Sequence, residues 1–382
     1  MYPRIISLNK TLERKSLFLL GPRQTGKSTY LKSNYADAHI INLLEADTFR
    51  RYSSKPELLR QELNEHTQLL VIDEIQKAPQ LLDEVHNLIE INKQLRFILT
   101  GSSARKLIRG KANMLAGRAS RKFMFPLCSK ELEFQHINKM LNYGSLPSII
   151  DSPAPIEDLN DYIGIYLKEE IFNESLTRSI ELFSHFLEST AFSNAEQINY
   201  TKIGNDCGIP PRTVRDHFQI LYDTMMAHEL TPLKLKQKNS RKTVSISKFY
   251  FFDIGVANRL AGNRDIHNSP EQLGKSLEHL IFLELLTYKN YRNSELKINF
   301  WRTQAKQEVD FVLNRSIAIE VKASSKIQKK HCKSLQLLSN ETQLEKKIIV
   351  CFEKKQLTLE NGIKVYPVHE FLKALWEGEI VS

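Results

Sequence analysis

The segment Gly21–Ser28 combines residue types that can hold a chain of phosphates. It fits the pattern GxxxxGK[ST] throughout, with an apolar run before it and a helix-like stretch after it, so a chance glycine-rich turn is a poor explanation. Glycines let backbone N–H groups curl around phosphate oxygens at the positive end of a helix dipole. Lys27 can bridge the outer phosphates, and the Ser28 hydroxyl can ligate Mg²⁺. We predict contacts to a nucleoside triphosphate, most simply ATP, from Gly21, Pro22, Arg23, Gln24, Thr25, Gly26, Lys27, Ser28 and Thr29.

Two acids end a second apolar run, LLVIDEIQ (69–76). Acids at the end of such a strand place Asp73 beside a metal, together with Ser28, and Glu74 where it can orient an attacking water. The same acids could instead cap a helix, but their combination with the upstream glycine-rich loop favours the metal and water roles.

A third apolar run, RFILTGSS (96–103), ends in small hydroxyl residues. Thr100, Ser102 or Ser103 could therefore sense the outermost phosphate from the end of a strand. Together the three motifs predict an ATP-hydrolysing core that uses ATP and Mg²⁺.

A separate acidic set lies in EVDFVLNRSIAIEVK (308–322). Side chains two apart on a strand share a face, so Glu320 and Lys322 project together, and Asp310 on the preceding strand can come beside them. Glu278, on the helix before, can complete the set. These three carboxylates can hold Mg²⁺ or Mn²⁺ over a scissile phosphate, while Lys322 stabilises charge or activates water. The alternatives are a hairpin with solvated charges and a fold that has lost catalysis.

The stretch 200–230 is typical of a helix, a turn and a second helix. Gly208 can end the first helix, and Pro210 and Pro211 can open the next, where a missing N–H costs little. A basic, alternating segment follows and suggests a winged helix. Such a domain can bind DNA or serve as a protein-interaction module. We predict DNA contacts from Arg212, Thr213, Arg215 and His217 of the second helix and from Lys234, Lys236, Lys238, Arg241 and Lys242 of the wing.

The elements that must position these residues divide the chain into three parts. Apolar runs at 16–20, 39–43, 68–73 and 96–101 alternate with amphipathic segments such as 81–92, which predicts an α/β domain with a parallel sheet. A helical middle part follows, and then a long helix at 276–291 with strands at 297–302, 308–313, 317–322 and 347–352. The predicted domains are residues 1–150, 151–265 and 266–382.

These motifs carry a family resemblance. GPRQTGKST, VIDEIQKAP, FILTGSS and LAGRASRKFMFPL resemble AAA+-type ATPases of bacteria and archaea, and are similar to the STAND-like branch of that superfamily. The likeness covers about residues 1–135 and implies an AAA+-like P-loop NTPase fold. It also makes Arg118 of LAGR a candidate arginine finger or phosphate-sensing arginine, with a structural surface role as the alternative.

The C-terminal pattern resembles the PD-(D/E)xK, or restriction-endonuclease-like, fold. ATPases of this kind frequently carry such a domain after a winged helix. The resemblance implies an α/β nuclease-like domain in which Glu278, Asp310, Glu320 and Lys322 are the site residues.

Bulk composition agrees with a soluble protein that meets an anionic partner. The formal charge is +10, and net charge alone does not choose between nucleic acid, an acidic protein and anionic lipid. Cys128, Cys207, Cys332 and Cys351 form no CxxC pair, which favours small core residues in a reducing cytoplasm. No apolar stretch is long enough to cross a membrane. A homo-oligomer is compatible with the sequence.

The leading hypothesis is an ATP-dependent enzyme that binds DNA and cleaves it with Mg²⁺. The second is a nucleotide-controlled, STAND-like switch whose C-terminal fold is inert. A kinase is a weaker third, because no acceptor-binding lid motif is visible and DEIQ after the strand is an ATPase arrangement.

Overall fold

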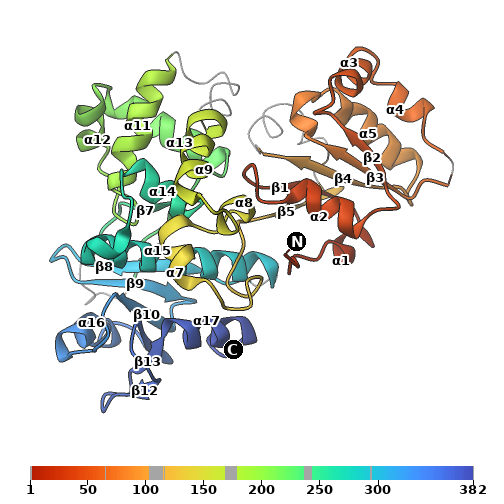
Figure 1. Cartoon of the computed structure of the whole chain (residues 1–382). Helices are drawn as coiled ribbons and strands as arrows, with labels where there is room; N and C mark the ends of the chain where they lie inside the picture. Colours follow the sequence, from red (N-terminus) through yellow and green to blue (C-terminus); the bar gives the residue numbers. More distant parts are fainter. Residues whose placement is uncertain are drawn as a thin grey trace. The chain divides into compact units, whose positions relative to one another are not determined.

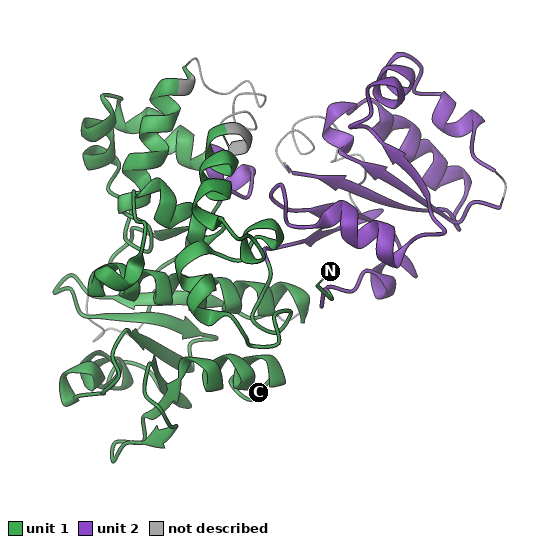
Figure 2. Ribbon diagram, in the orientation of Figure 1, with its two compact units in different colours: residues 1–3, 127–219, 227–382 green, residues 4–126, 220–226 purple. Residues whose placement is uncertain are grey.

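The computed structural model describes residues 2–64, 66–102, 115, 117–167, 179–235, 243–292 and 295–381. The chain forms two compact units (Figure 2). One comprises residues 4–126 and 220–226, and the other comprises 1–3, 127–219 and 227–382. This division does not test the predicted domain limits after residues 150 and 265, which stay predictions.

A parallel five-stranded sheet with the order β2-β3-β4-β1-β5 forms the first unit (Figure 1). Four of its strands coincide with the predicted apolar runs, and β5 is an additional edge strand. The strands are β1 (Ser16–Leu20), β2 (His39–Asn42), β3 (Leu69–Asp73), β4 (Arg96–Gly101) and β5 (Ala119–Phe123). The helices are α1 (Asn9–Leu12), α2 (Lys27–Asn34), α3 (Ala46–Ser54), α4 (Leu58–Gln61), η1 (Ile75–Lys77) and α5 (Leu81–Ile91).

Alternate residues of each central strand face opposite sides, and both sides are buried. Phe18, Leu70 and Phe97 face a core completed by residues of α3, α4 and α5. Residues one position along, such as Val71 and Ile98, are equally inaccessible. Burial of both faces explains why these strands are continuously apolar.

The middle of the chain is mostly helical. Its α12 ends at Cys207 and is capped by Gly208, whose φ of 67° is left-handed, and α13 starts at Pro211, as the sequence predicts. An antiparallel pair, β6 and β7, follows α13. The elements are α7 (Ile137–Tyr143), α8 (Pro147–Ile150), α9 (Pro155–Asp161), η3 (Tyr162–Leu167), α11 (Ile180–Phe192), α12 (Tyr200–Cys207), α13 (Pro211–Asp223), β6 (Ala227–Leu230), β7 (Lys248–Phe251), α14 (Ile254–Leu260) and η4 (Ile266–Asn268).

A mixed six-stranded sheet with the order β12-β13-β11-β10-β9-β8 organises the C-terminal part (Figure 1). Strands β8, β9 and β10 are antiparallel neighbours. Strands β10 and β11 are parallel neighbours, and α16 connects them along the chain. The elements are α15 (Pro270–Tyr291), β8 (Ile298–Arg302), β9 (Glu308–Leu313), β10 (Ile317–Lys322), η5 (Lys329–Cys332), α16 (Lys333–Ser339), β11 (Lys346–Cys351), β12 (Leu357–Thr358), β13 (Lys364–Pro367) and α17 (Val368–Glu377).

The four cysteines are buried free thiols, which confirms their prediction as core residues. Across the described ranges, no helix has both the length and the apolar content needed to span a membrane.

Candidate functional sites

The glycine-rich loop connects the carboxyl end of β1 to the first turn of α2. Gly26 precedes α2 with a φ of 91°, a conformation that favours glycine. The Lys27 ammonium is buried inside the loop, where Nζ lies 2.6 Å from the carbonyl oxygen of Gly21 and 2.9 Å from that of Pro22. A Cβ atom at Gly21 would lie 2.3 Å from the Met124 carbonyl oxygen, so only glycine fits there.

The other predicted loop contacts lie around this lysine. Thr25 is buried, and its hydroxyl donates to the Pro22 carbonyl oxygen at 2.9 Å. Arg23 is half-buried, whereas Gln24 and Thr29 are exposed. The loop is therefore closed on its inner side and open to solvent at its tip.

Asp73 and Thr100 stand beside the loop at the carboxyl ends of β3 and β4. Ser28 Oγ donates to Asp73 Oδ2 at 2.7 Å, and Thr100 Oγ1 donates to Asp73 Oδ1. The Glu74 backbone N–H donates to Thr100 Oγ1 at 3.0 Å. The structure thus brings together the predicted metal ligands Ser28 and Asp73. Thr100 is fully buried and is hydrogen-bonded to Asp73 and to the Glu74 backbone, so it orients these two residues; its predicted role as a phosphate sensor stays a prediction.

Glu74 has a left-handed φ of 62° at the end of β3, which turns its side chain away from the strand direction. Gln76 Nε2 donates to Glu74 Oε2 and, at 3.2 Å, to Ser102 Oγ. Sequence reasoning missed Gln76, although it lies only two residues after Glu74. The third predicted sensor, Ser103, lies outside the described residues.

Arg4 is another loop contact that the motifs do not reveal. Its guanidinium donates to the Thr25 carbonyl oxygen at 2.5 Å and to the Phe125 carbonyl oxygen at 2.7 Å. Arg4 thereby ties the phosphate loop to the segment after β5. No pattern around Arg4 in the sequence signals this role.

Arg118 is not brought to the phosphate loop of its own domain. Ala119 pairs with Ser16 at the amino end of β1, about five residues or roughly 16 Å from the loop. The Arg118 guanidinium forms an exposed ion pair with Glu90, near the end of α5. The structure therefore does not place Arg118 beside the phosphate loop of its own domain. Its role as an arginine finger or phosphate-sensing arginine stays a prediction.

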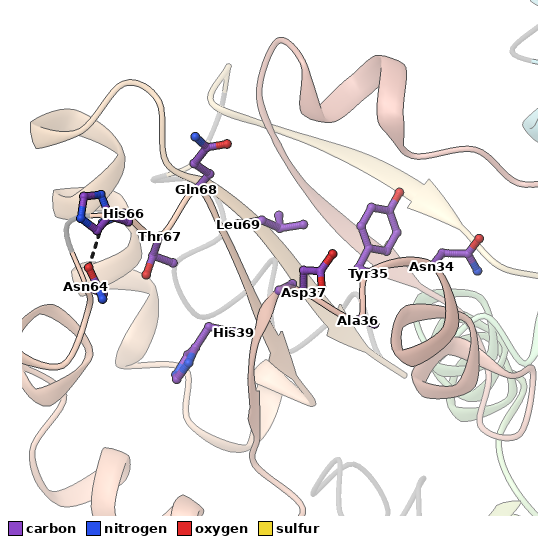
Figure 3. Close-up of a pocket in the computed structure, with 11 residues that line it drawn as sticks. Asn34, Tyr35, Ala36, Asp37, His39, Asn64, His66, Thr67, Gln68 and Leu69 are labelled. Carbon is purple, nitrogen blue, oxygen red and sulfur yellow. Dashed lines mark hydrogen bonds between the residues drawn. The ribbon is translucent and has the colours of Figure 1, made fainter.

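A pocket of about 530 Å³ lies at the amino ends of β2 and β3 in the same sheet (Figure 3). Its lining includes Tyr35, Asp37, His39, Thr67 and Gln68, from the segments that enter β2 and β3. Ligands of open α/β sheets bind outside the carboxyl ends of the strands. The pocket lies at the amino ends and contains none of the predicted site residues.

The C-terminal acidic residues also converge. A pocket of about 340 Å³ is lined by Glu278 of α15, Asp310 of β9, Lys322 of β10 and His331 of η5. Glu320, also on β10, is 5% exposed and does not line this pocket. The structure therefore brings together all four predicted residues of this site.

Asp310 and Glu320 lie on the adjacent antiparallel strands β9 and β10, and the Lys322 ammonium is close to both carboxylates. Lys322 Nζ lies 2.5 Å from Glu320 Oε1 and 3.9 Å from Asp310 Oδ2, which also accepts from the Val321 N–H at 2.7 Å. Glu320 Oε2 is buried and has no hydrogen-bond partner. Burial and the nearby Asp310 raise the pKa of Glu320 well above its usual value. A buried carboxylate oxygen without a partner fits a bound cation.

Glu278 is engaged differently. Its Oε1 accepts from Lys248 Nζ at 2.8 Å and from the Tyr250 hydroxyl at 2.6 Å, and Lys248 also pairs with Glu308. Burial raises the pKa of Glu278 to about 7, although Lys248 opposes that shift. Among the described residues, no group of three or more His, Cys, Asp or Glu is arranged to hold a metal. The metal role predicted for Glu278 thus has no preformed three-carboxylate site to support it.

Sequence reasoning missed Lys248, Tyr250 and Glu308. A usable signal exists, because Lys248 and Tyr250 are two apart on β7 and must share a face. A lysine and a tyrosine alternating with phenylalanines on a strand with all four residues buried require a polar partner. The sequence does not reveal that the partner is Glu278, 30 residues away.

The helix α13 presents only part of its predicted nucleic-acid surface. Arg212 and Arg215 are exposed, and the Arg215 guanidinium lies 4.9 Å from the Tyr200 ring centroid. The prediction for His217 is wrong, because its ring is buried between Phe183 and Phe186 at centroid distances of 5.0 and 4.9 Å.

Two further residues predicted to contact DNA differ in exposure. Thr213 is half-buried and Lys234 is exposed. The wing residues Lys236, Lys238, Arg241 and Lys242 lie outside the described residues.

Comparison with known proteins agrees with the geometry of the phosphate loop. Residues 13–133 match the family described as AAA domain. This match covers the segment that holds the phosphate loop and the parallel sheet. Residues 134–267 and 273–371 match two domains of unknown function, DUF8612 and DUF4143.

An uncharacterized protein of Haemophilus influenzae (strain ATCC 51907 / DSM 11121 / KW20 / Rd) is 22% identical over 324 residues, which cover 79% of this chain and 76% of that protein. Among solved structures, domain III of the Thermotoga maritima replication initiation protein DnaA aligns with a TM-score of 0.23 and 12% identity. That alignment covers 56% of this chain and 87% of the DnaA chain. Similarity at this level carries no argument about what the protein binds.

Proposed function

We propose that the N-terminal domain binds ATP with Mg²⁺ and hydrolyses it. The observation that carries this proposal is the hydrogen-bonded set Ser28, Asp73 and Thr100 beside the phosphate loop. The Lys27 ammonium, held by loop carbonyl oxygens, is the group that would turn to the outer phosphates. Ser28 and Asp73 would hold Mg²⁺, which neutralises phosphate charge, and Glu74 would orient the attacking water.

Turnover of ATP by the full-length chain tests this proposal. Glu74→Gln should lower the hydrolysis rate by about 100-fold or more while leaving nucleotide binding intact, because only the group that orients water is changed. Lys27→Ala should remove binding of a labelled nucleotide. The exposed Lys32, on the same helix, supplies the control Lys32→Ala, which should behave like wild type. Hydrolysis at the wild-type rate by Glu74→Gln would refute the assignment.

For the C-terminal part we propose Mg²⁺-dependent cleavage of DNA. The order α15, β8, β9, β10, α16, β11 agrees with the α/β core implied by the PD-(D/E)xK resemblance. Asp310 and the unpartnered oxygen of Glu320 would hold a divalent cation, whose chemistry is to polarise a phosphodiester. Lys322 lies beside both carboxylates, where its ammonium can stabilise the negative charge that develops on the phosphate.

We further propose that the middle part, as a winged helix, holds the DNA. The support is the exposure of Arg212 and Arg215 on α13 and the net charge of +10. Phosphate contacts make binding salt-dependent, and each contact removed lowers the slope of log K against log salt by about one. Arg212→Ala and Arg215→Ala should each weaken binding to duplex DNA in this way. An unchanged slope in the double variant would exclude α13 as the DNA contact.

Cleavage is tested with plasmid DNA, Mg²⁺ and ATP. Asp310→Asn and Lys322→Met should each abolish nicking, whereas Lys355→Met, at an exposed lysine outside the pocket, should leave it unchanged. Persistent cleavage in both site variants would refute the nuclease assignment.

A second candidate function is a nucleotide-controlled switch with an inert C-terminal domain. The observation that favours it is the neutralisation of Glu278 and Glu308 by Lys248. Nucleotide-dependent capture of a protein partner, with no nicking by the wild type, would select this alternative.

A further inference from the structure

A buried lysine from outside the acidic hairpin is built into the C-terminal site. Lys248, the first residue of β7, is 2% exposed. Its Nζ lies 2.8 Å from Glu278 Oε1, pairs with Glu308 Oε1, and lies 5.5 Å from the Phe300 ring centroid. These contacts join a strand of the middle part to α15 and β9, 30 and 60 residues further along the chain.

The charges around Lys248 explain why it is tolerated there. A buried ammonium is stable only when it is paired and hydrogen-bonded, and Lys248 has two carboxylates. The same holds in reverse, because Glu278 and Glu308 would repel each other without a cation between them. Glu308 has a second partner, Arg302, at 2.5 Å, whereas Glu278 has only Lys248 and the neutral Tyr250 hydroxyl in the described structure.

Asp310 and Glu320 form a contrasting pair in the same site. Both carboxylates pair with Lys322, which is half-buried and lines the pocket, and Glu320 Oε2 has no hydrogen-bond partner. The two halves of the acidic site therefore differ in how far their negative charge is balanced by cationic side chains. The half near Glu278 is already neutralised from within, and the half near Glu320 is not.

We propose that Lys248 is an internal substitute for a cation, which holds Glu278 and Glu308 and limits this site to one divalent cation, at Asp310 and Glu320. The proposal rests on the cleavage function proposed above for the cation at Asp310 and Glu320. It makes Lys248 a positioning residue and assigns Glu278 to Lys248 rather than to the metal. It also makes metal loading depend on the placement of β7.

Binding of Mn²⁺ to the full-length chain, followed by electron paramagnetic resonance without nucleotide, tests this. A Ser28→Ala/Asp73→Asn background removes the predicted N-terminal ligands, so the C-terminal site is observed alone. In that background we expect one Mn²⁺. Asp310→Asn should lower its affinity by about tenfold or more, whereas Glu278→Gln should change it less than about threefold. Equal losses in the two variants would overturn the proposal.

Replacing the lysine gives the complementary result. Lys248→Met should add a second Mn²⁺ that is lost again in Lys248→Met/Glu278→Gln, while Lys248→Arg, which keeps the charge, should add none. If Lys248→Met is unfolded without metal, recovery of its thermal transition by Mn²⁺ supports the same conclusion. A folded Lys248→Met that binds no additional Mn²⁺ would contradict it.

The two proposals fail in different ways. If the background binds no Mn²⁺, the cation at Asp310 and Glu320 fails, and the cleavage function fails with it. A Glu278-dependent Mn²⁺ gained by Lys248→Met would still support Lys248 as a substitute cation in that case.

Discussion

The hydroxyl of Ser28 donates a 2.7 Å hydrogen bond to Asp73 Oδ2, which joins the first turn of α2 to the end of β3. The other oxygen of Asp73 accepts from Thr100. Both oxygens are therefore oriented by hydroxyl groups from neighbouring elements. A carboxylate fixed in this way needs little reorganisation to receive a cation beside the phosphate loop.

Thr100→Val should remove the hydrogen bonds that orient Asp73 while keeping a side chain of nearly the same shape. Valine removes the donor to Asp73 and the acceptor for the Glu74 N–H at a fully buried position. Leaving that N–H unsatisfied should cost about 1–3 kcal/mol of stability. Loss of an orienting partner should slow ATP turnover by about tenfold to 100-fold.

Steady-state ATPase assays and thermal unfolding measure the two effects of Thr100→Val. Thr100→Ser is the control, because it keeps the hydroxyl that donates to Asp73 and accepts from the Glu74 N–H. Full activity in Thr100→Val would show that Asp73 does not need this partner.

We predict that Arg118 assists hydrolysis at a neighbouring copy. It lies beside the amino end of β1, whereas its own phosphate loop follows the carboxyl end of that strand. If a homo-oligomer forms, Arg118→Ala and Glu74→Gln should each be inactive alone. A mixture should regain part of the activity, since an intact Glu74 then meets an intact Arg118 from the partner. The ATPase rate of mixed and unmixed samples checks this. Full activity of Arg118→Ala alone would mean that Arg118 has a structural role only, through its surface ion pair with Glu90.

Gly144 is required by the closeness of a buried carboxylate. Its φ is +77°, and a Cβ atom there would lie 2.0 Å from Asp253 Oδ1. Asp253 accepts from the Ser145 and Val256 N–H groups at 2.8 and 3.1 Å, so it cannot move without losing these bonds. Gly144→Ala should cost about 3 kcal/mol and lower Tm by roughly 5–10 °C.

Differential scanning calorimetry measures this cost. Gly274→Ala is the control, because a Cβ atom at Gly274 meets nothing within 4 Å and alanine favours a helix. An unchanged transition in Gly144→Ala would mean that the loop before α8 rearranges freely.

The strands with both faces buried could be predicted from the sequence, but the edge strand β5 could not. β1, β3 and β4 are continuously apolar because each lies between two neighbours under helices. β5 reads Ala-Ser-Arg-Lys-Phe and has no fully buried residue. Unlike β2, the other edge strand, β5 carries no hydrophobic run, so its pairing with β1 is visible only in the folded sheet.

The candidate sites show the same limit. Residues within one motif, such as Lys27 and Ser28, could be assigned because the loop positions them locally. His217 was misplaced because charge and helix position do not reveal which face packs against Phe183 and Phe186. Lys248 could not be assigned to the acidic site, since its partners come from other elements.

Glu284 of α15 should make stability depend on pH. Its carboxylate is fully buried and accepts from the Ser129 N–H, the Ser129 hydroxyl and Trp376 Nε1, at 2.6, 2.8 and 2.7 Å. Burial raises its pKa to about 7, the three donors oppose that shift, and the nearby Glu131 adds to it. The folded chain then binds more protons than the unfolded chain between the ordinary pKa of 4.5 and about 7.

Stability from protonated Glu284 is therefore complete below about pH 4.5 and is lost as pH rises through about 7. Glu284→Gln lacks this titration, so the stability difference between wild type and variant should shrink from pH 5 to pH 8. Chemical unfolding at half-unit pH steps measures it. Glu345→Gln, at an exposed site, controls for general charge effects and should show a constant difference. A difference that widens with pH would mean that the three donors stabilise an ionised Glu284 in the folded chain.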